Sequence, residues 1–244
     1  MSTRPLALIT GANQGIGLAV AQSLARDHSF RVLIGCRNID AGEKAASELR
    51  SDGHEASAIE LDLTSSDSIQ AAISRIEKDH GYLDVLINNA GILIDVDTSL
   101  STWDLFQRTF STNVIGPATL TEGLLPLLRK AEVGPPRLVF VSSIMGSLGV
   151  STDETMPWYN IDYKAYDASK AAVNMLTINY NRILADTAAR VNSACPGLVR
   201  TQLTGYIEGA TTTDLGAKRI VELATLGPDG PTCTFSNLQG PIAW

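Results

Sequence analysis

The chain has 244 residues, of which 44% are hydrophobic and 18% are charged, proportions that suit one globular domain with a large core. Its net charge of −7 disfavours a general nucleic-acid surface, because phosphate binding requires clustered lysine and arginine. No apolar run approaches the roughly 20 residues that span a bilayer, so we expect neither a membrane segment nor a membrane partner.

Cysteine and histidine usage narrows the chemistry further. The three cysteines, Cys36, Cys195 and Cys233, are scattered without the spacing of a metal site. Such a set predicts free thiols in a reducing compartment, and we expect a cytoplasmic protein. The first strand begins near Pro5, which leaves no room for a cleavable signal peptide. The histidines each lie near polar turn residues, so the sequence favours neither a metal centre nor a histidine-based catalytic triad.

Short apolar runs alternate with longer segments of helical periodicity along the whole chain. The expected strands cover residues 6–9, 31–36, 56–61, 83–87, 137–141, 190–194 and 232–236. The expected helices cover residues 18–25, 40–52, 68–78, 101–129, 164–187 and 200–226, the fourth with kinks or breaks at Pro117 and Pro126. Strict alternation implies parallel strands with right-handed crossovers. We therefore predict an α/β fold, a doubly wound parallel sheet (Rossmann fold) of about seven strands in three αβα layers, as a single domain over residues 1–244.

A glycine-punctuated turn, Gly11-Ala12-Asn13-Gln14-Gly15-Ile16-Gly17, joins the first strand to the first helix. Glycine lets the backbone turn tightly and approach a pyrophosphate, whose charge is met by free N–H groups at the helix N-terminus. The spacing differs from G-x-G-x-x-G, and a tight turn of any α/β protein is the alternative. The position between a buried strand and a helix favours a dinucleotide site.

The end of the second strand indicates which dinucleotide binds. It reads Gly35-Cys36-Arg37-Asn38, with no carboxylate until Asp40, which we expect to cap the next helix. An NAD site usually places an acidic residue here to hold the ribose 2′-hydroxyl. A carboxylate would repel a 2′-phosphate, whereas a guanidinium can bind it through two hydrogen bonds. Arg37 therefore favours NADP(H), with a solvated arginine as the alternative.

Tyr166 and Lys170 lie four residues apart at the start of a long helix, so the phenol and the ammonium share a face. A free phenol has a pKa of about 10 and is a poor acid–base catalyst near neutrality. A nearby ammonium favours the phenolate and lowers that pKa. Ser142 and Ser143 end the preceding strand, where a hydroxyl could hold a substrate oxygen. The tyrosine could then protonate a carbonyl oxygen as hydride reaches the carbon, although Tyr-x-x-x-Lys alone is also typical of an ordinary surface pair.

Together these motifs resemble the short-chain dehydrogenase/reductase family, of the small single-domain type. The matching residues follow the family order and cover nearly the whole chain: Thr10-Gly11-x-x-x-Gly15-Ile16-Gly17, Asn88-Asn89-Ala90-Gly91, Asn113, Ser143, Tyr166-x-x-x-Lys170 and Pro196-Gly197. The form of the glycine loop and the long gap between Ser143 and Tyr166 resemble the carbonyl-reductase-like branch, which uses NADPH.

The resemblance implies roles for four catalytic residues. Tyr166 would be the general acid and base, and Lys170 would lower its pKa. Ser143 would position the substrate carbonyl, and Asn113 would anchor a water in a proton relay. The implied cofactor-binding residues are Gly11, Asn13, Gln14, Gly15, Ile16, Gly17, Arg37, Asp62, Leu63, Asn89, Ala90, Gly91, Tyr166, Lys170, Pro196, Gly197, Val199 and Thr201.

Two of these assignments have plain structural alternatives. Asn113 could simply hydrogen-bond a helix kink near Gly116-Pro117. Asp62, expected to contact the adenine, could instead cap the turn before Leu63-Thr64.

Two segments are expected to cover the substrate. An insertion expected near residues 150–163, with Trp158 and Tyr159, lies between two of the implied catalytic residues. The segment near residues 198–227 should form the opposite wall. An insertion that is only a surface excursion is the alternative, but aromatic residues gain most from burial, which favours a packed role.

The sequence thus predicts an NADPH-dependent oxidoreductase that reversibly reduces a small-molecule ketone or aldehyde to an alcohol. The alternatives are a catalytically silent NADP(H)-binding sensor protein and a nucleotide-sugar epimerase or dehydratase on a related fold. The sequence leaves the substrate open, together with the choice between a monomer and a homo-oligomer.

Overall fold

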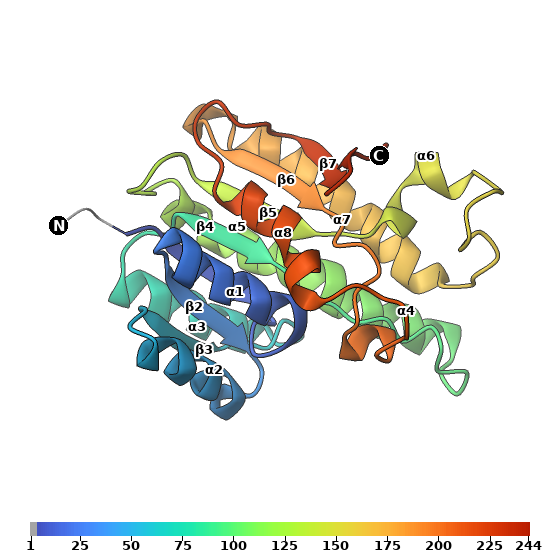
Figure 1. Ribbon diagram of the computed structural model, residues 1–244, viewed down its shortest axis with the longest axis horizontal. Helices are drawn as coiled ribbons and strands as arrows, with labels where there is room; N and C mark the ends of the chain where they lie inside the picture. The colour runs from blue at the N-terminus through green and yellow to red at the C-terminus, as the bar shows by residue number, and fades with distance from the viewer. Residues whose placement is uncertain (1–3) are drawn as a thin grey trace.

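Eight strands form one sheet at the centre of the computed structural model, which describes residues 4–244 (Figure 1). Their order is β3-β2-β1-β4-β5-β6-β7-β8, and every neighbouring pair is parallel except β7 and β8. The strands are β1 (Leu6–Thr10), β2 (Arg31–Cys36), β3 (Ala56–Glu60), β4 (Val85–Asn88), β5 (Arg137–Val141), β6 (Arg190–Ala194), β7 (Thr234–Asn237) and β8 (Gly240–Pro241). The predicted doubly wound parallel sheet is confirmed, with one short antiparallel strand added at its edge.

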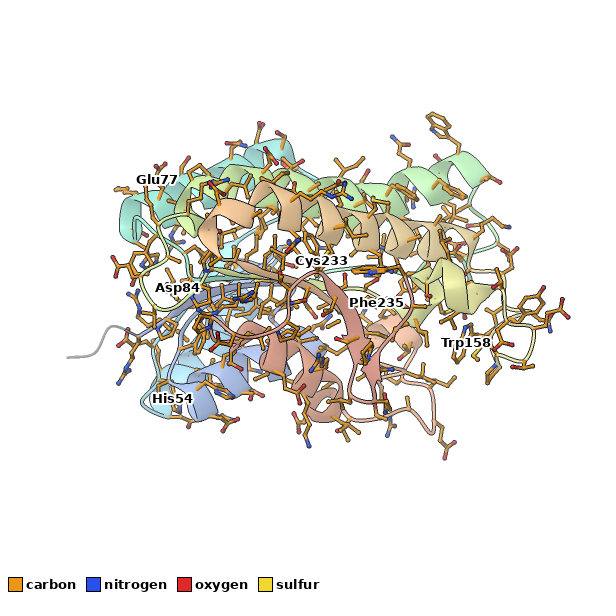
Figure 2. The ribbon with its side chains drawn as sticks, turned by 90° about the horizontal axis from the view of Figure 1, so that it is seen from above. His54, Glu77, Asp84, Trp158, Cys233 and Phe235 are labelled. Atoms are coloured by element: carbon orange, nitrogen blue, oxygen red, sulfur yellow. The ribbon has the colours of Figure 1, made fainter. Side chains whose placement is uncertain are left out.

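Helices cover both faces of the sheet, as Figure 2 shows with Glu77 of α3 in one layer and His54, which follows α2, on the other side. Helices α3, α5 and α7 pack on one face, and α1, α2 and α8 pack on the opposite face. The helices are α1 (Gly15–His28), α2 (Ile39–Ser51), α3 (Ser66–Asp79), α4 (Thr102–Phe110), α5 (Gly116–Leu128), α6 (Leu148–Ser151), α7 (Lys164–Ile183) and α8 (Thr213–Ala224).

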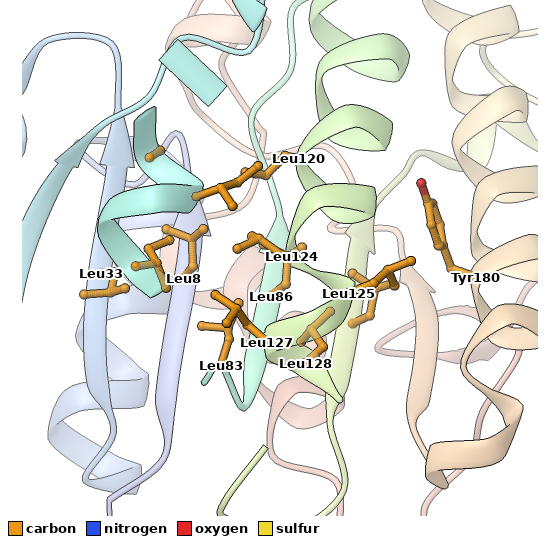
Figure 3. Close-up of a cluster of buried hydrophobic side chains, with 14 of the residues drawn as sticks. Leu8, Leu33, Leu83, Leu86, Leu120, Leu124, Leu125, Leu127, Leu128 and Tyr180 are labelled. Carbon is orange, nitrogen blue, oxygen red and sulfur yellow. The ribbon is translucent and has the colours of Figure 1, made fainter. Parts of the chain in front are cut away.

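The central strands β1, β4 and β5 are largely apolar because both of their faces are buried. Along β1, Leu8 joins the apolar cluster beneath α3, α5 and α7, while its neighbour Ile9 joins the cluster beneath α1, α2 and α8. Figure 3 shows leucines of α5, such as Leu124, facing leucines of the sheet, such as Leu86. The leucine and β-branched residues of the strands therefore pack against helices on both faces of the sheet, in two separate apolar layers.

The strand order reverses at β1, whose neighbours are β2 and β4. The chain leaves β1 into α1 on one face and leaves β4 towards α4 and α5 on the other. The carboxyl ends of the two strands therefore border an open crevice, the usual ligand position in such sheets.

The long helix expected over residues 101–129 is one helical region with an internal change of hydrogen bonding. A π-helical turn, η1 (Ser111–Ile115), separates α4 from α5. Pro117 does not break the helical region, because it is the second residue after the π-helical turn, where the regular i→i−4 hydrogen-bond pattern is already interrupted. Pro126 is accommodated inside α5 near its end.

Three other expectations need correction. The helix expected over residues 200–226 is a 3₁₀ turn, η4 (Gln202–Thr204), then a loop, then α8, since Gly205 and Gly209 adopt positive φ angles of 61° and 81° between them. Asp40 is not the cap of α2, because the Asn38 side chain accepts the Ala41 N–H at 3.0 Å and Asp40 lies in the first turn. The strand β8 was not expected, since two residues carry no hydrophobic pattern.

Replacing Leu124, which is fully buried, by alanine should destabilise the protein by about 2–5 kcal/mol, because the leucine leaves a cavity between α5 and the sheet. Urea unfolding measures this change. Leu148→Ala is the control: Leu148 is exposed, so the change in unfolding free energy should stay within about 0.5 kcal/mol. Equal effects of the two substitutions would contradict this description of the core.

Candidate active site

A cavity of about 1020 Å³ lies at the carboxyl ends of the strands. All eighteen residues that the sequence implied as cofactor-binding line it, from the glycine loop after β1 to Thr201 after β6, and so does Ser143. Asn113 does not line it. The structure thus brings together segments from nearly the whole length of the chain.

The glycine loop leaves the start of α1 open to an anion. Gly11 and Gly15 adopt positive φ angles of 65° and 59°, which fold the backbone back before the helix begins. The N-cap Gln14 makes no side-chain capping bond, and the first turn of α1 has no acidic residue. The N–H groups of that turn therefore keep their hydrogen-bonding capacity and the positive end of the helix dipole.

Asn89 braces this loop from β4. Its Nδ2 donates to the Thr10 carbonyl at 2.8 Å, and its backbone N–H donates to the Thr10 hydroxyl at 3.0 Å. A Cβ on Gly17 would lie 2.6 Å from Asn89 Nδ2 and 2.6 Å from the Gly11 carbonyl oxygen. Gly17 therefore serves close packing of the helix start on the loop, while Gly11 and Gly15 serve the turn itself.

Arg37 is exposed at the end of β2 and faces the same cavity as Asp62, which follows β3. Asp62 Oδ1 accepts the Thr64 N–H at 2.9 Å and the Thr64 hydroxyl at 2.7 Å, so it does cap the turn, as the structural alternative required. Burial disfavours ionisation of Asp62, but the Thr64 hydrogen bonds and the Arg37 charge outweigh it and lower its pKa. The polar end of the cavity thus carries one cation and one anion.

Tyr166 and Lys170 are both buried on α7, and the Lys170 Nζ lies 5.6 Å from the centroid of the tyrosine ring. The Lys170 ammonium donates to the Val141 carbonyl at 2.9 Å. Ser143 is the second residue after β5, and its hydroxyl accepts the Met145 N–H at 3.2 Å. The phenol, the ammonium and the serine hydroxyl therefore converge at one point of the cavity, where β5 ends.

Burial controls how the two groups on α7 titrate. It raises the pKa of the Tyr166 phenol above its ordinary value of about 10, against the opposing hydrogen bond with Ser143. It lowers the pKa of the Lys170 ammonium to about 8. The effect of burial on the pKa of Tyr166 is therefore larger than the lowering effect of Lys170 that the sequence predicts. The phenol keeps its proton at neutral pH and can act as an acid.

Asn113 lies in the π-helical turn η1, and its side chain is fully hydrogen-bonded. Its Oδ1 accepts the Ile92 N–H at 2.8 Å, and its Nδ2 donates to the Ile92 carbonyl at 2.9 Å and to Ser169 Oγ at 3.0 Å. These partners are the loop after β4 and helix α7, not the segment near Gly116-Pro117. The side chain therefore ties the loop that lines the cavity to the helix that carries Tyr166.

Asp95 is a residue that the sequence analysis missed. Its carboxylate accepts the backbone N–H of Ala165 at 2.8 Å and that of Tyr166 at 3.2 Å, and so caps α7 from the loop after β4. The N-cap of α7, Tyr163, makes no capping bond of its own. No local pattern reveals this contact, because 70 residues separate the cap from the helix.

Cys195 is a second missed residue, and it precedes Pro196 at the end of β6. Its Sγ accepts the Ile144 N–H at 3.2 Å, which joins the turn after Ser143 to the next strand. Burial raises the pKa of this thiol. The neutral sulfur therefore acts here as a packing and hydrogen-bonding atom beside the candidate catalytic group.

The segment of residues 150–163 leaves α6 and returns to α7, and several of its side chains, including Trp158 and Ile161, line the cavity. The end of the chain holds the start of this segment. Ser147 Oγ donates to the Ala243 carbonyl at 2.6 Å, and the Gly149 N–H donates to the Trp244 carbonyl at 2.9 Å. The Trp244 ring stacks on Phe235 of β7, with ring centroids 5.8 Å apart.

Over residues 4–244, no helix is long and apolar enough to cross a membrane. In the same range, no group of three or more His, Cys, Asp or Glu side chains is arranged to hold a metal ion.

Asp167, next to Tyr166, provides a pH test of this region. Burial, followed by the charges of Asp95 and Asp162, raises its pKa to about 7. The folded state therefore favours the protonated form, and this stabilisation is full below about pH 4 and is lost as the pH rises through 7. Asp167→Asn should raise the Tm relative to the wild type more at pH 8 than at pH 5 in thermal unfolding.

The control for this measurement is Asp97→Asn. Hydrogen bonds from Ser99 lower the pKa of Asp97, so its ionised form is the one that the folded state favours. The substitution should not raise the Tm at pH 8. A gain of the same size from both variants would mean that general charge reduction, and not the site around Asp167, controls the pH dependence.

Comparison with known proteins agrees with this geometry. The sequence model described as short chain dehydrogenase matches residues 5–211. The chain is 36% identical over 228 residues to the short-chain dehydrogenase anuI of Penicillium roqueforti, covering 92% of this chain and 90% of that protein. It is 30% identical over 274 residues to carbonyl reductase [NADPH] 1 of Mus musculus, covering 96% of each.

The crystal structure of NADPH-bound carbonyl reductase from chicken fatty liver superimposes with a TM-score of 0.85 at 29% identity, covering 99% of this chain and 100% of that one. The match to the sequence model, these identities and the shared fold lead to one conclusion: the chain belongs to the short-chain dehydrogenase family of oxidoreductases.

Proposed function

We propose that this protein is an NADP(H)-dependent carbonyl reductase that converts a ketone or aldehyde to the alcohol, reversibly. The observation that carries the proposal is a single cavity lined by an open helix N-terminus, an exposed arginine, the buried Tyr166 and Lys170, and the half-buried Ser143. The names of two similar proteins, a carbonyl reductase [NADPH] and an NADPH-bound carbonyl reductase, support it.

The residues present fit a phosphorylated dinucleotide. The uncapped start of α1 suits a pyrophosphate, because its N–H groups and dipole favour an anion. Arg37 forms no ion pair within the part of the chain that the structure describes, so its guanidinium is available to a 2′-phosphate at the same end of the cavity. When bound, the nicotinamide cofactor supplies the hydride.

The protein's own groups would perform the acid–base half of the reaction. The Ser143 hydroxyl donates to the substrate carbonyl oxygen and orients it towards Tyr166. Tyr166 gives its proton to that oxygen as the alkoxide charge develops, because burial keeps the phenol protonated at neutral pH. Lys170 lies 5.6 Å from the tyrosine ring and stabilises the phenolate that remains. In alcohol oxidation the same phenolate accepts the proton.

A cytoplasmic location is part of the proposal. Its support is that Cys36, Cys195 and Cys233 are free thiols, two of them buried, as a reducing compartment keeps them.

Tyr166→Phe should lower kcat for carbonyl reduction by at least about 100-fold, because general acid catalysis typically contributes that much. The Kd for NADPH, measured by quenching or shift of its fluorescence, should stay within about twofold of the wild type, since the ring remains. Tyr159→Phe, at an exposed tyrosine outside the cavity, is the matched control. Retained turnover in the Tyr166 variant would exclude the acid role, and absence of turnover in the wild type would favour an NADP(H)-binding sensor.

Arg37→Asp should weaken NADPH binding by about 10- to 100-fold, the range expected for the loss of charge-assisted hydrogen bonds, while NADH binding changes little. Fluorescence titration with both cofactors measures the ratio. Arg182→Asp, at an exposed arginine on α7 away from the cavity, controls for the change in net charge. A uniform loss for NADPH and NADH would mean that Arg37 has only a structural role.

A further inference from the structure

Exposed apolar side chains gather around the cavity beyond the candidate catalytic residues. They come from three segments: the loop after β4, the segment of residues 150–163 and the segment after β6. The exposed apolar residues that line the cavity are Val96, Ile161, Leu198, Leu203, Tyr206 and Ile207. Val96 is 66% exposed and Tyr206 is 58% exposed.

These exposed apolar side chains from three segments line one and the same cavity. Single exposed apolar residues are normal on any protein surface, but a concave cluster of them marks a ligand site. Here the cluster is continuous with the cavity that holds Tyr166 and Ser143. An apolar ligand seated there would remove these side chains from water while its reactive group lies at the tyrosine.

The charged residues of the cavity are distributed unevenly. Among the described residues that line it, the charged ones are Arg37, Asp62, Lys170 and Arg200. Arg37 and Asp62 lie at the ends of β2 and β3, and the Lys170 ammonium is held by the Val141 carbonyl. Arg200 is therefore the one charge on the wall after β6, and it is exposed.

Other uncharged polar side chains that line the cavity, such as Gln202, Thr204 and Asn237, already make hydrogen bonds within the protein. The Ser143 and Tyr166 hydroxyls serve a single oxygen atom, where β5 ends. Around them, Ile144, Met145, Leu93 and Trp158 present hydrocarbon, aromatic and thioether surface to the cavity. Figure 2 shows Trp158 on the segment that extends beyond the end of the sheet. Apart from Arg200, this surface offers a charged or richly hydroxylated substrate few groups that could replace its hydration.

We infer that the substrate is a bulky, uncharged ketone or aldehyde with an apolar, ring-bearing body, whose carbonyl is its main polar group. This inference rests on the proposed function, since it describes the compound that occupies the same site. The aromatic faces of Trp158 and Tyr206, on different segments, suit flat rings. Small hydroxyketones, 2-oxo acids and phosphorylated carbonyl compounds are the classes that this surface disfavours.

The test compares matched ketones with NADPH-saturated enzyme by the absorbance of NADPH. The probes are cyclohexanone, 1-tetralone and a 1-tetralone that bears a carboxylate on its aromatic ring. We expect kcat/KM to rise at least about tenfold from cyclohexanone to 1-tetralone, chiefly through KM, and to fall at least about tenfold when the carboxylate is added. A preference for cyclohexanone would overturn the inference while leaving the proposed function intact. So would a preference for the carboxylate, and its loss in Arg200→Ala would assign an anionic substrate to that arginine.

A variant tests the apolar surface directly. Ile207→Asp places a carboxylate in it and should lower kcat/KM for 1-tetralone at least about tenfold, by raising KM, with the Kd for NADPH within about twofold. Leu148→Asp is the matched control, because Leu148 is 73% exposed but does not line the cavity. Equal losses in both variants, or no loss in Ile207→Asp, would overturn the inference.

A binding measurement separates this inference from the proposed function. Calorimetric titration of the protein, saturated with NADP⁺, with 1-tetralone and its carboxylate reports on the apolar surface without turnover. Selective binding of the uncharged ketone, with a negative heat-capacity change, would support the inference even if no ketone were reduced. Absence of both binding and turnover for 1-tetralone would overturn it.

Discussion

The candidate active site depends on the hydrogen bonds that hold the first half of α7 against the loop after β4. Asp95 caps the helix at the backbone of Tyr166 itself, and Asn113 joins Ile92 in that loop to Ser169 one turn further on. The same loop begins with Asn89, which braces the glycine turn. Positions on both sides of the cavity are thus fixed relative to one strand end, in addition to the packing of α7 on the sheet.

This arrangement explains how a buried ammonium is tolerated. Removing Lys170 from water is unfavourable and lowers its pKa, but the Val141 carbonyl accepts a hydrogen bond from it at the end of β5. Gly146 permits the close approach, since a Cβ there would lie 2.6 Å from Lys170 Cβ. The end of β5 and the turn after it therefore serve two purposes, because they seat the lysine and present Ser143.

Much of this could be predicted from the sequence where the signal is local. Buried parallel strands give continuous apolar runs, so the sheet and its crossovers were predictable. The glycine turn was predictable from Gly11, Gly15 and Gly17 between a strand and a helix. The spacing of Tyr166 and Lys170 is likewise a property of one helix. Asp95 carries no such signal, because its partners lie 70 residues away and nothing in the neighbouring sequence distinguishes it from other loop aspartates. The direction of the Tyr166 pKa shift could not be predicted from the sequence either. Burial raises this pKa, whereas the spacing to Lys170 predicts that it is lowered.

The part of the cavity formed by residues 150–163 is held in place by different contacts from the part around Tyr166. The segment of residues 150–163 is tethered where it begins, by hydrogen bonds from Ser147 and Gly149 to the last two residues of the chain. Those residues are held in turn by the stacking of Trp244 on Phe235, at the edge of the sheet. The bonds that orient Tyr166 belong to α7 and the loop after β4, and they do not pass through this edge. Under the proposed function, substitutions among the exposed apolar residues of the cavity would change which ketone is accepted while Tyr166 keeps its geometry. Such a division suits a fold in which one reaction serves many substrates.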